Sequence, residues 1–254
     1  MKVLKIILYV LLAVIVFTTL FINISPQFGS NPSRAQKQFF SSFKNFKNGE
    51  FKNNEPTALF TDEMSIWDFF KTELNRVPIK EIIPLNVDVE SFVKDNIEQI
   101  KMVWLGHSAF LININGAVIL LDPMLGSHAA PVPLPSLKRY SSQIAFDIDE
   151  LEVIDFVVFS HDHYDHLDYP TIKKIKSRVK KFIVPHGIGN HLKSWGVQSK
   201  SIIELNWDES FNYNGIEFVC LPARHFSGRG PLNRNSTLWS SWAIKSNRGK
   251  IYFS

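Results

Sequence analysis

The chain has 254 residues, 45% of them hydrophobic, so one mid-sized domain with an N-terminal appendage fits better than two independent domains. Its 28 basic and 24 acidic residues leave a net charge of +4, too small to indicate a nucleic-acid partner without a concentrated basic stripe. Cys220 is the one cysteine, which excludes an intramolecular disulfide and a cysteine-rich zinc module. Because Cys220 lies in an apolar run, we expect a core residue without a catalytic role.

The N-terminus carries a long apolar segment. After Lys2 and Lys5, residues 6–22 contain no charge, which is close to the roughly 20 residues that cross a membrane. A cleaved signal peptide would have a shorter apolar region and a small-x-small cleavage site, and residues 18–23 offer no such site. We therefore predict a single-pass transmembrane anchor at residues 1–25. Both flanks of this segment are basic, so its orientation in the membrane stays open.

Residues 26–98 are predicted to form a juxtamembrane linker and an N-terminal extension. Within residues 34–52, cations alternate with phenylalanines at a spacing that could lie on an anionic lipid surface. An equally open alternative is a solvated linker whose phenylalanines pack on the domain. Residues 65–74 show a helical pattern, and nothing in residues 53–99 resembles a repeat or a chemical motif.

Residues 99–254 alternate strand and helix patterns. Asn115-Gly116 and Asn214-Gly215 stand between apolar runs and indicate hairpin turns, and the prolines at 131, 133 and 135 indicate a loop. Helices are predicted at residues 167–179 and 189–195. Strands are predicted at residues 100–104, 109–114, 117–121, 156–160, 181–184, 201–204, 211–221 as a hairpin, 237–246 and 250–253. Antiparallel strands mixed with strand-helix units predict an α/β sandwich.

A short segment between a buried strand and a helix carries the chemistry: His161-Asp162-His163-Tyr164-Asp165-His166. Alternate residues of an extended loop point the same way, so His161 and His163 can bind one metal ion while Asp165 and His166 face a second. Two such ions could share a water and lower its pKa, so that hydroxide forms near neutral pH and acts as the nucleophile. Zinc suits these ligands best, although iron and manganese also accept imidazole and carboxylate.

The other residues near the motif are interpreted individually. Asp162 is out of phase with the ligands and is expected to lie on the surface or to support them from behind, and Tyr164 to pack or to offer its hydroxyl to substrate. We expect His128, His186 and His191 to be loop or capping residues, because none has ligand-like neighbours in the sequence. His225 follows a strand at a loop mouth, a position suited to completing the first metal site.

From residue 102 to 254 the chain resembles metallo-β-lactamase-fold hydrolases of the N-acylphosphatidylethanolamine phospholipase D type. The sequence pattern around the metal motif (H-x-H-Y-D-H-L-D-Y) and the later pattern W-x-S-W narrow the resemblance to this type. The matching segments are Trp104-Leu105-Gly106-His107-Ser108, Leu120-Leu121-Asp122-Pro123, residues 154–169, residues 222–227 and Leu238-Trp239-Ser240-Ser241-Trp242.

The resemblance implies an αββα sandwich with two zinc ions in a cleft at one edge. It implies that His161, His163 and His225 bind the first ion and that Asp165 and His166 bind the second, with Asp165 also counted as catalytic. The implied reaction is hydrolysis of a membrane phosphodiester to phosphatidic acid and an N-acylethanolamine. Arg229 and Arg234 are the candidates for holding the phosphate, although both could be solvated loop charges.

In the family, a strand like residues 250–253 leads into a Gly-Asp-[Ser/Thr]-Gly loop whose aspartate bridges both metals, and a further histidine ligand follows. Because the sequence ends at Ser254, we expect an incomplete second half of the sandwich. We also expect the first metal to bind better than the second, with little turnover. Near two ions per chain together with full activity would contradict this expectation.

Two other functions stay open. The same ligands would serve a lactonase or a sugar-phosphate hydrolase, because the metals dictate hydrolysis rather than the substrate. The chain could also be an inactive membrane-anchored domain that retains half a site and only binds. A nuclease is disfavoured because the sequence lacks the basic groove that a nucleic acid demands. The sequence does not indicate an oligomeric state.

Overall fold

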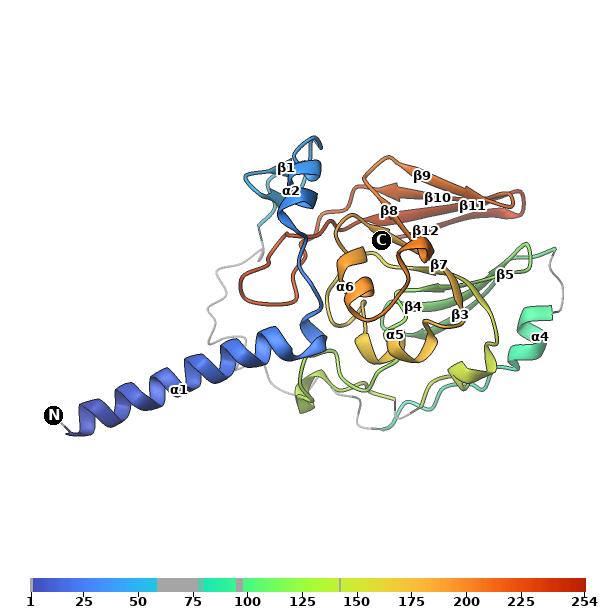
Figure 1. Cartoon of the computed structure of the whole chain (residues 1–254). Coiled ribbons are helices and arrows are strands. Elements are labelled where there is room, and N and C mark those ends of the chain that lie inside the picture. Colours follow the sequence, from blue (N-terminus) through green and yellow to red (C-terminus); the bar gives the residue numbers. More distant parts are fainter. Residues whose placement is uncertain (1, 59–77, 79, 95–97, 142) are drawn as a thin grey trace.

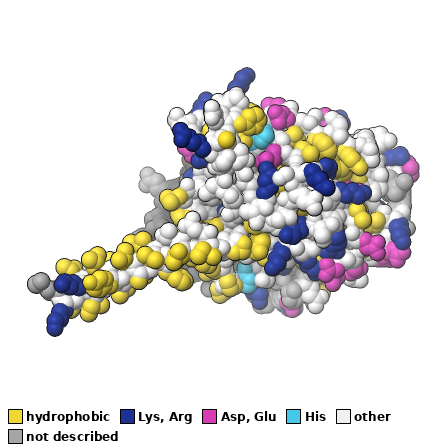
Figure 2. All heavy atoms as spheres, in the orientation of Figure 1, with side chains coloured by type: hydrophobic (Ala, Val, Ile, Leu, Met, Phe, Trp, Pro, Cys, Tyr) yellow, Lys and Arg dark blue, Asp and Glu magenta, His cyan; other side chains and the backbone are white. Residues whose placement is uncertain are grey.

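The computed structural model describes residues 2–58, 78, 80–94, 98–141 and 143–254 (Figure 1). Helix α1 (Lys2–Ile24) extends away from the rest of the described chain, and none of its residues is buried. Apolar side chains cover its length in Figure 2. By length and composition, α1 could cross a membrane. The helical pattern predicted at residues 65–74 lies outside the described residues.

A six-stranded sheet forms the centre of the molecule. Its strand order is β3 (Lys101–Gly106), β4 (Ala109–Ile114), β5 (Ala117–Leu121), β6 (Ile154–Val158), β7 (Val179–Pro185) and β8 (Ile202–Leu205). The first three strands pair antiparallel and the last three continue parallel from β5. Asn115 and Gly116 both have positive φ, as the two-residue turn between β4 and β5 requires. The antiparallel hairpins therefore lie on one side of the parallel strands.

Helix α5 (Tyr169–Ile175) connects β6 to β7, and α6 (Gly189–Ser194) connects β7 to β8, as is usual between parallel strands. Their apolar residues, such as Ile172 and Leu192, pack in one core cluster with Leu120 and Val157 of the six-stranded sheet. These two helices thus cover one face of that sheet (Figure 1). The described chain also contains short 3-10 helices: η1 (Pro26–Phe28), η2 (Pro135–Leu137), η3 (Ile148–Glu150) and η4 (Ser199–Ser201).

The second sheet is antiparallel, in the order β12 (Gly249–Phe253), β11 (Ser241–Ser246), β10 (Ile216–Leu221) and β9 (Ser210–Tyr213). Alternate residues of β10 are buried, and they pack in a second core cluster with residues from the other face of the six-stranded sheet. Two sheets therefore face each other, with helices outside the larger one. The predicted α/β sandwich is confirmed.

The segment predicted as a linker and extension contributes to this core. It contains α2 (Arg34–Phe40), β1 (Phe46–Lys47), β2 (Glu50–Phe51) and α4 (Val89–Lys94). Phe40, Phe46 and Phe51 are at most 6% exposed and belong to the cluster between the sheets, whereas Phe39 is exposed. Of the two alternatives for these phenylalanines, packing on the domain is the one found. Residues 34–51 therefore contribute to the core of the sandwich, and the domain boundary near residue 99 stays a prediction.

Several predicted boundaries shift, and three of these shifts have a clear physical cause or consequence. Strand β6 begins and ends two residues earlier than predicted, which frees Ser160 and His161 from the sheet. Helix α5 begins later because the Asp168 side chain caps it, accepting the Thr171 N–H at 3.0 Å. Residues 237–240 precede β11 instead of extending it, because the Leu238 and Ser240 N–H groups donate to the carbonyls of His186 and Ser160.

Candidate metal centre

Three imidazoles converge at the edge of the six-stranded sheet where β6 ends. His161 and His163 lie in the loop that follows β6, and His225 comes from the loop that follows β10 in the other sheet. His161 Nε2 lies 3.0 Å from both His163 Nδ1 and His225 Nε2, and the last two atoms are 3.3 Å apart. Nitrogens bound to one tetrahedral zinc at about 2.0–2.1 Å would lie about 3.3–3.4 Å from each other. The spacing of these donors therefore fits one metal ion.

The protonation states of these imidazoles also suit a cation. Burial, with the charges of the neighbouring imidazoles, lowers the pKa of His225 to about 4. The same causes hold the pKa of His161 well below its ordinary value, and burial lowers that of His163. All three rings are therefore neutral at pH 7, with lone pairs available for a metal.

A second group of possible ligands lies beside the first. Asp165 Oδ2 lies 3.0 Å from His107 Nε2 and 3.6 Å from His166 Nε2. Burial would raise the pKa of Asp165, but the hydrogen bond from His107 and the charge of His166 hold it well below its ordinary range. Asp165 is therefore ionised at neutral pH. Two imidazoles and one carboxylate are a donor set that divalent zinc, iron or manganese accepts.

A buried carboxylate orients the ligands from behind. Asp122 directly follows β5, and its Oδ2 lies 2.6 Å from His166 Nδ1, which leaves Nε2 of that ring facing the centre. Asp122 also accepts the Ser160 N–H at 2.7 Å and the Ser160 hydroxyl, whose oxygen lies 2.8 Å from His161 Nδ1. A carboxylate behind a ligating histidine fixes its tautomer and ring orientation. Burial would lower the pKa of His166, but the hydrogen bond to Asp122 and its charge raise it.

For Asp162 and Tyr164, two alternatives each were open, and the structure favours one of them. Asp162 is completely buried, so a surface position was wrong and a supporting position is what the structure has. Burial would raise its pKa, but the hydrogen bond and charge of His191 lower it to about 2. The Tyr164 hydroxyl donates to the Arg229 carbonyl at 2.7 Å, so this side chain packs against the loop.

The two arginines proposed to hold a phosphate lie in very different places. The Arg229 guanidinium is buried and donates to the carbonyls of Gln27, Asp162 and Leu167. With its donors occupied inside the protein, Arg229 supports the fold, and its expected phosphate contact is corrected. Arg234 is exposed, and its guanidinium lies 4.4 Å from the centre of the Phe226 ring.

A pocket of about 330 Å³ opens beside His225. Among its lining residues are three cationic side chains, Lys52, Arg224 and Arg234, and one acidic side chain, Glu55. Arg224 Nε lies 3.5 Å from Thr57 Oγ1, and Lys52 pairs with Glu50 at 2.5 Å. The pocket therefore combines a possible metal ligand with an excess of positive charge.

His107, Asp122 and His191 take part in the site, although the motif alone did not point to them. The sequence held a signal for the first two, because both lie in segments that carried the resemblance, and Asp122 directly follows a predicted strand. For His191 the sequence held none: its partner Asp162 is 29 residues away, and its neighbours in the chain carry no carboxylate.

Comparisons with known proteins identify the family of the chain. A family model described as a beta-lactamase superfamily domain matches residues 118–254. A nematode protein named N-acyl-phosphatidylethanolamine-hydrolyzing phospholipase D 1 (Caenorhabditis elegans) is 30% identical over 242 residues, covering 88% of this chain and 67% of the relative. A metal-dependent hydrolase from Hyperthermus butylicus is 28% identical over 130 residues, half of this chain and 51% of the relative.

An uncharacterized protein of Mycobacterium tuberculosis is 34% identical over 215 residues. The match covers 82% of this chain and 56% of the relative, so the chain spans a little over half the length of that protein.

Proposed function

The chain belongs to the beta-lactamase superfamily; from this premise we propose that it is a metal-dependent hydrolase that acts on N-acylphosphatidylethanolamine-type membrane phosphodiesters. Cleavage on the headgroup side of the phosphate would release phosphatidic acid and an N-acylethanolamine. The nematode relative carries this activity in its name and matches most of the present chain. The cationic side chains of the pocket beside His225 also support a phosphodiester substrate.

The residues of the candidate metal centre have separate parts in this proposal. His161, His163 and His225 would hold one divalent cation, and Asp165, His166 and His107 a second. The cations, when bound, supply Lewis-acid activation of water and of a phosphoryl oxygen. Zinc is our proposed metal. Asp122 keeps the proton of His166 on Nδ1, and Asp165 brings the negative charge that two cations beside neutral imidazoles need.

The pocket beside His225 is the observation that carries the choice of a phosphodiester. A phosphodiester is anionic, and guanidinium groups bind phosphate oxygens with charge-assisted hydrogen bonds. Arg234 is exposed at this pocket and has no carboxylate partner among the described ion pairs. A phosphate lying there would be next to a metal bound by His225. We therefore assign substrate binding to Arg234.

A lipid substrate also suits the position of α1, which we propose to be a membrane anchor. Phe28, just after this helix, packs edge-to-face on Phe21 of α1, with ring centres 5.6 Å apart, and on Tyr164, at 6.4 Å. Tyr164 belongs to the loop that carries the metal motif. The end of α1 therefore lies beside the candidate centre, within reach of a substrate held in a membrane.

The test is hydrolysis of N-acylphosphatidylethanolamine in mixed micelles by the zinc-loaded chain, assayed for phosphatidic acid and N-acylethanolamine. We expect slow release of both products, loss of release in His163→Ala, and the wild-type rate in the matched control His128→Ala, which lies outside the groups of possible metal ligands. Turnover of a lactone or a sugar phosphate with no turnover of the lipid would reject the substrate class while keeping the metal-dependent hydrolase.

A further inference from the structure

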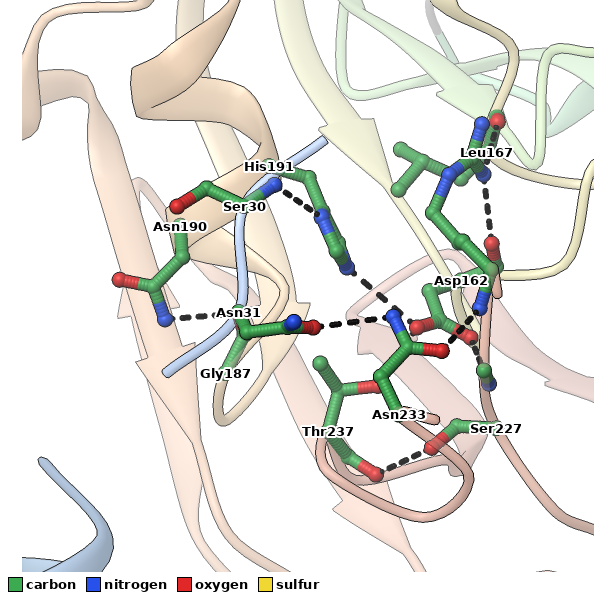
Figure 3. Close-up of polar contacts among 12 residues, drawn as sticks. Ser30, Asn31, Asp162, Leu167, Gly187, Asn190, His191, Ser227, Asn233 and Thr237 are labelled. Atoms are coloured by element: carbon green, nitrogen blue, oxygen red, sulfur yellow. Dashed lines mark hydrogen bonds and ion pairs between the residues drawn. The ribbon is translucent and has the colours of Figure 1, made fainter. Parts of the chain in front are cut away.

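Asp162 stands between two candidate metal ligands, and a buried network holds it in place (Figure 3). Its carboxylate accepts the Gly228 N–H at 2.7 Å and the Thr237 hydroxyl at 2.9 Å, and lies 3.3 Å from His191 Nε2. Because neighbours on both sides in the sequence face the centre, the backbone at residue 162 sets how His161 and His163 are presented. Whatever fixes Asp162 also fixes those two ligands.

One of the groups that hold Asp162 is itself held by the segment that follows α1. The Ser30 N–H donates to His191 Nδ1 at 3.0 Å, so this nitrogen is an acceptor and the ring proton lies on Nε2, directed at Asp162 (Figure 3). Residue 29 must be glycine for this contact. It has a φ of +66°, and a Cβ there would lie 2.1 Å from His191 Nδ1.

A second connection runs through Arg229. Its Nε and one terminal nitrogen donate to the Gln27 carbonyl at 2.9 and 2.8 Å, and the other terminal nitrogen donates to the carbonyls of Asp162 at 2.6 Å and Leu167 at 2.8 Å. The guanidinium also lies over the Tyr164 ring, 4.1 Å from its centre. A single buried side chain thus joins the segment after α1 to both ends of the metal loop.

We propose that residues 26–31 are a positioning element of the metal centre, acting through His191 and Arg229 on the loop that carries His161 and His163. This inference rests on the proposed function, because it requires that the candidate centre binds a metal ion. Supporting hydrogen bonds of this kind typically change metal affinity by about 10–100-fold when lost. The segment would also tie the geometry of the centre to the placement of α1, so that the hydrolase and its membrane anchor act as one unit.

Gly29→Ala in the full chain is the test, with Gly215→Ala as its matched control. Residue 215 has a φ of +78°, and a Cβ there meets nothing within 4 Å, so both substitutions strain the backbone but only Gly29→Ala displaces His191. Zn²⁺ affinity is measured by competition with a chromophoric chelator, and the ligand geometry by the visible spectrum of the Co²⁺-loaded protein. Amide hydrogen exchange of residues 161–167 is measured in the metal-free protein.

We expect Gly29→Ala to bind Zn²⁺ about 10–100-fold more weakly, to alter the Co²⁺ spectrum and to speed exchange at residues 161–167, with none of these changes in Gly215→Ala. His191→Gln, which can still donate to Asp162, should keep more affinity than His191→Phe, which cannot. Wild-type affinity and exchange in Gly29→Ala would overturn the proposal. If the wild-type chain bound no metal, the proposed function would fail, and the exchange rates alone would decide the positioning role.

Discussion

The carboxylate of Asp122 lies 2.6 Å from Nδ1 of His166, although 44 residues separate them in the chain. Asp122 has a φ of +38° at the end of β5, a conformation that aspartate tolerates better than most residues. The side chain is completely buried beneath the centre. This pair turns the free nitrogen of His166 toward Asp165.

Asp122→Asn is expected to weaken metal binding at the group formed by His107, Asp165 and His166 by about 10–100-fold, because an amide no longer holds the His166 proton on Nδ1 by charge. Asp122→Ala should in addition lower the free energy of unfolding by about 1–3 kcal/mol, since the buried Ser160 N–H loses its acceptor. Zinc titration and nitrogen NMR of His166 measure the first effect, and urea denaturation the second. An unchanged His166 tautomer in Asp122→Asn would contradict the assignment.

His225→Ala is expected to weaken binding of the first zinc by at least about 100-fold, more than the loss of an outer hydrogen bond costs. The residue supplies the donor that joins the loop after β10 to His161 and His163. Isothermal titration with Zn²⁺ measures the change, with His128→Ala as the control. Equal affinities of the two variants would remove His225 from the centre.

The metal-free protein is expected to lose stability as the pH falls from 7 toward 4. In the unfolded chain a histidine takes up a proton near pH 6.5, whereas the folded pKa of His225 is about 4 and those of His161 and His163 are also lowered. Between these values the unfolded state binds more protons, so stability rises with pH up to about 6.5. His166, whose pKa is raised, opposes the trend.

Thermal unfolding of the metal-free chain between pH 4 and 7 measures this dependence. In His225→Asn the slope should be shallower, because one of the groups that resist protonation is gone. An identical slope in the variant would show that His225 does not contribute.

Arg229→Lys and Arg234→Ala should separate support of the fold from binding of substrate. Arg229→Lys is expected to lower the free energy of unfolding by about 2–4 kcal/mol, because an ammonium cannot reach all the carbonyls that the guanidinium bonds. Arg234→Ala should change the free energy of unfolding by less than about 0.5 kcal/mol but raise KM for the phosphodiester about tenfold. Denaturant titrations and steady-state kinetics measure the two effects. The reverse pattern would restore Arg229 as the phosphate-binding residue.

A cation in the middle of α1 should weaken membrane insertion. Val14→Arg places a charge at the centre of the helix, at a cost of about 2.5–3.5 kcal/mol on insertion scales, whereas at Asn23 a long cation reaches the headgroups. We expect Val14→Arg to be extracted from membranes by alkaline carbonate more readily than Asn23→Arg. Equal extraction of the two variants would contradict an anchoring role for α1.

The sequence alone determined the sandwich class, most strands and helices, and the group of candidate metal ligands around residues 161–166. These features depend on local periodicity, on turn residues and on ligands a few positions apart, all of which can be read along the chain. The apolar helix at the N-terminus was equally visible, because its length and composition are local properties.

Only the tertiary structure decided which distant groups meet those ligands. Whether Phe40, Phe46 and Phe51 cover lipid or pack between the sheets depends on a surface that other strands provide. The roles of Asp122 and His191 also depend on contacts across tens of residues, and no local pattern encodes such contacts. For Arg229 the sequence offered a phosphate contact or a solvated loop position. It gave no sign of burial, because a buried guanidinium needs acceptors, and here these are carbonyls from two distant segments.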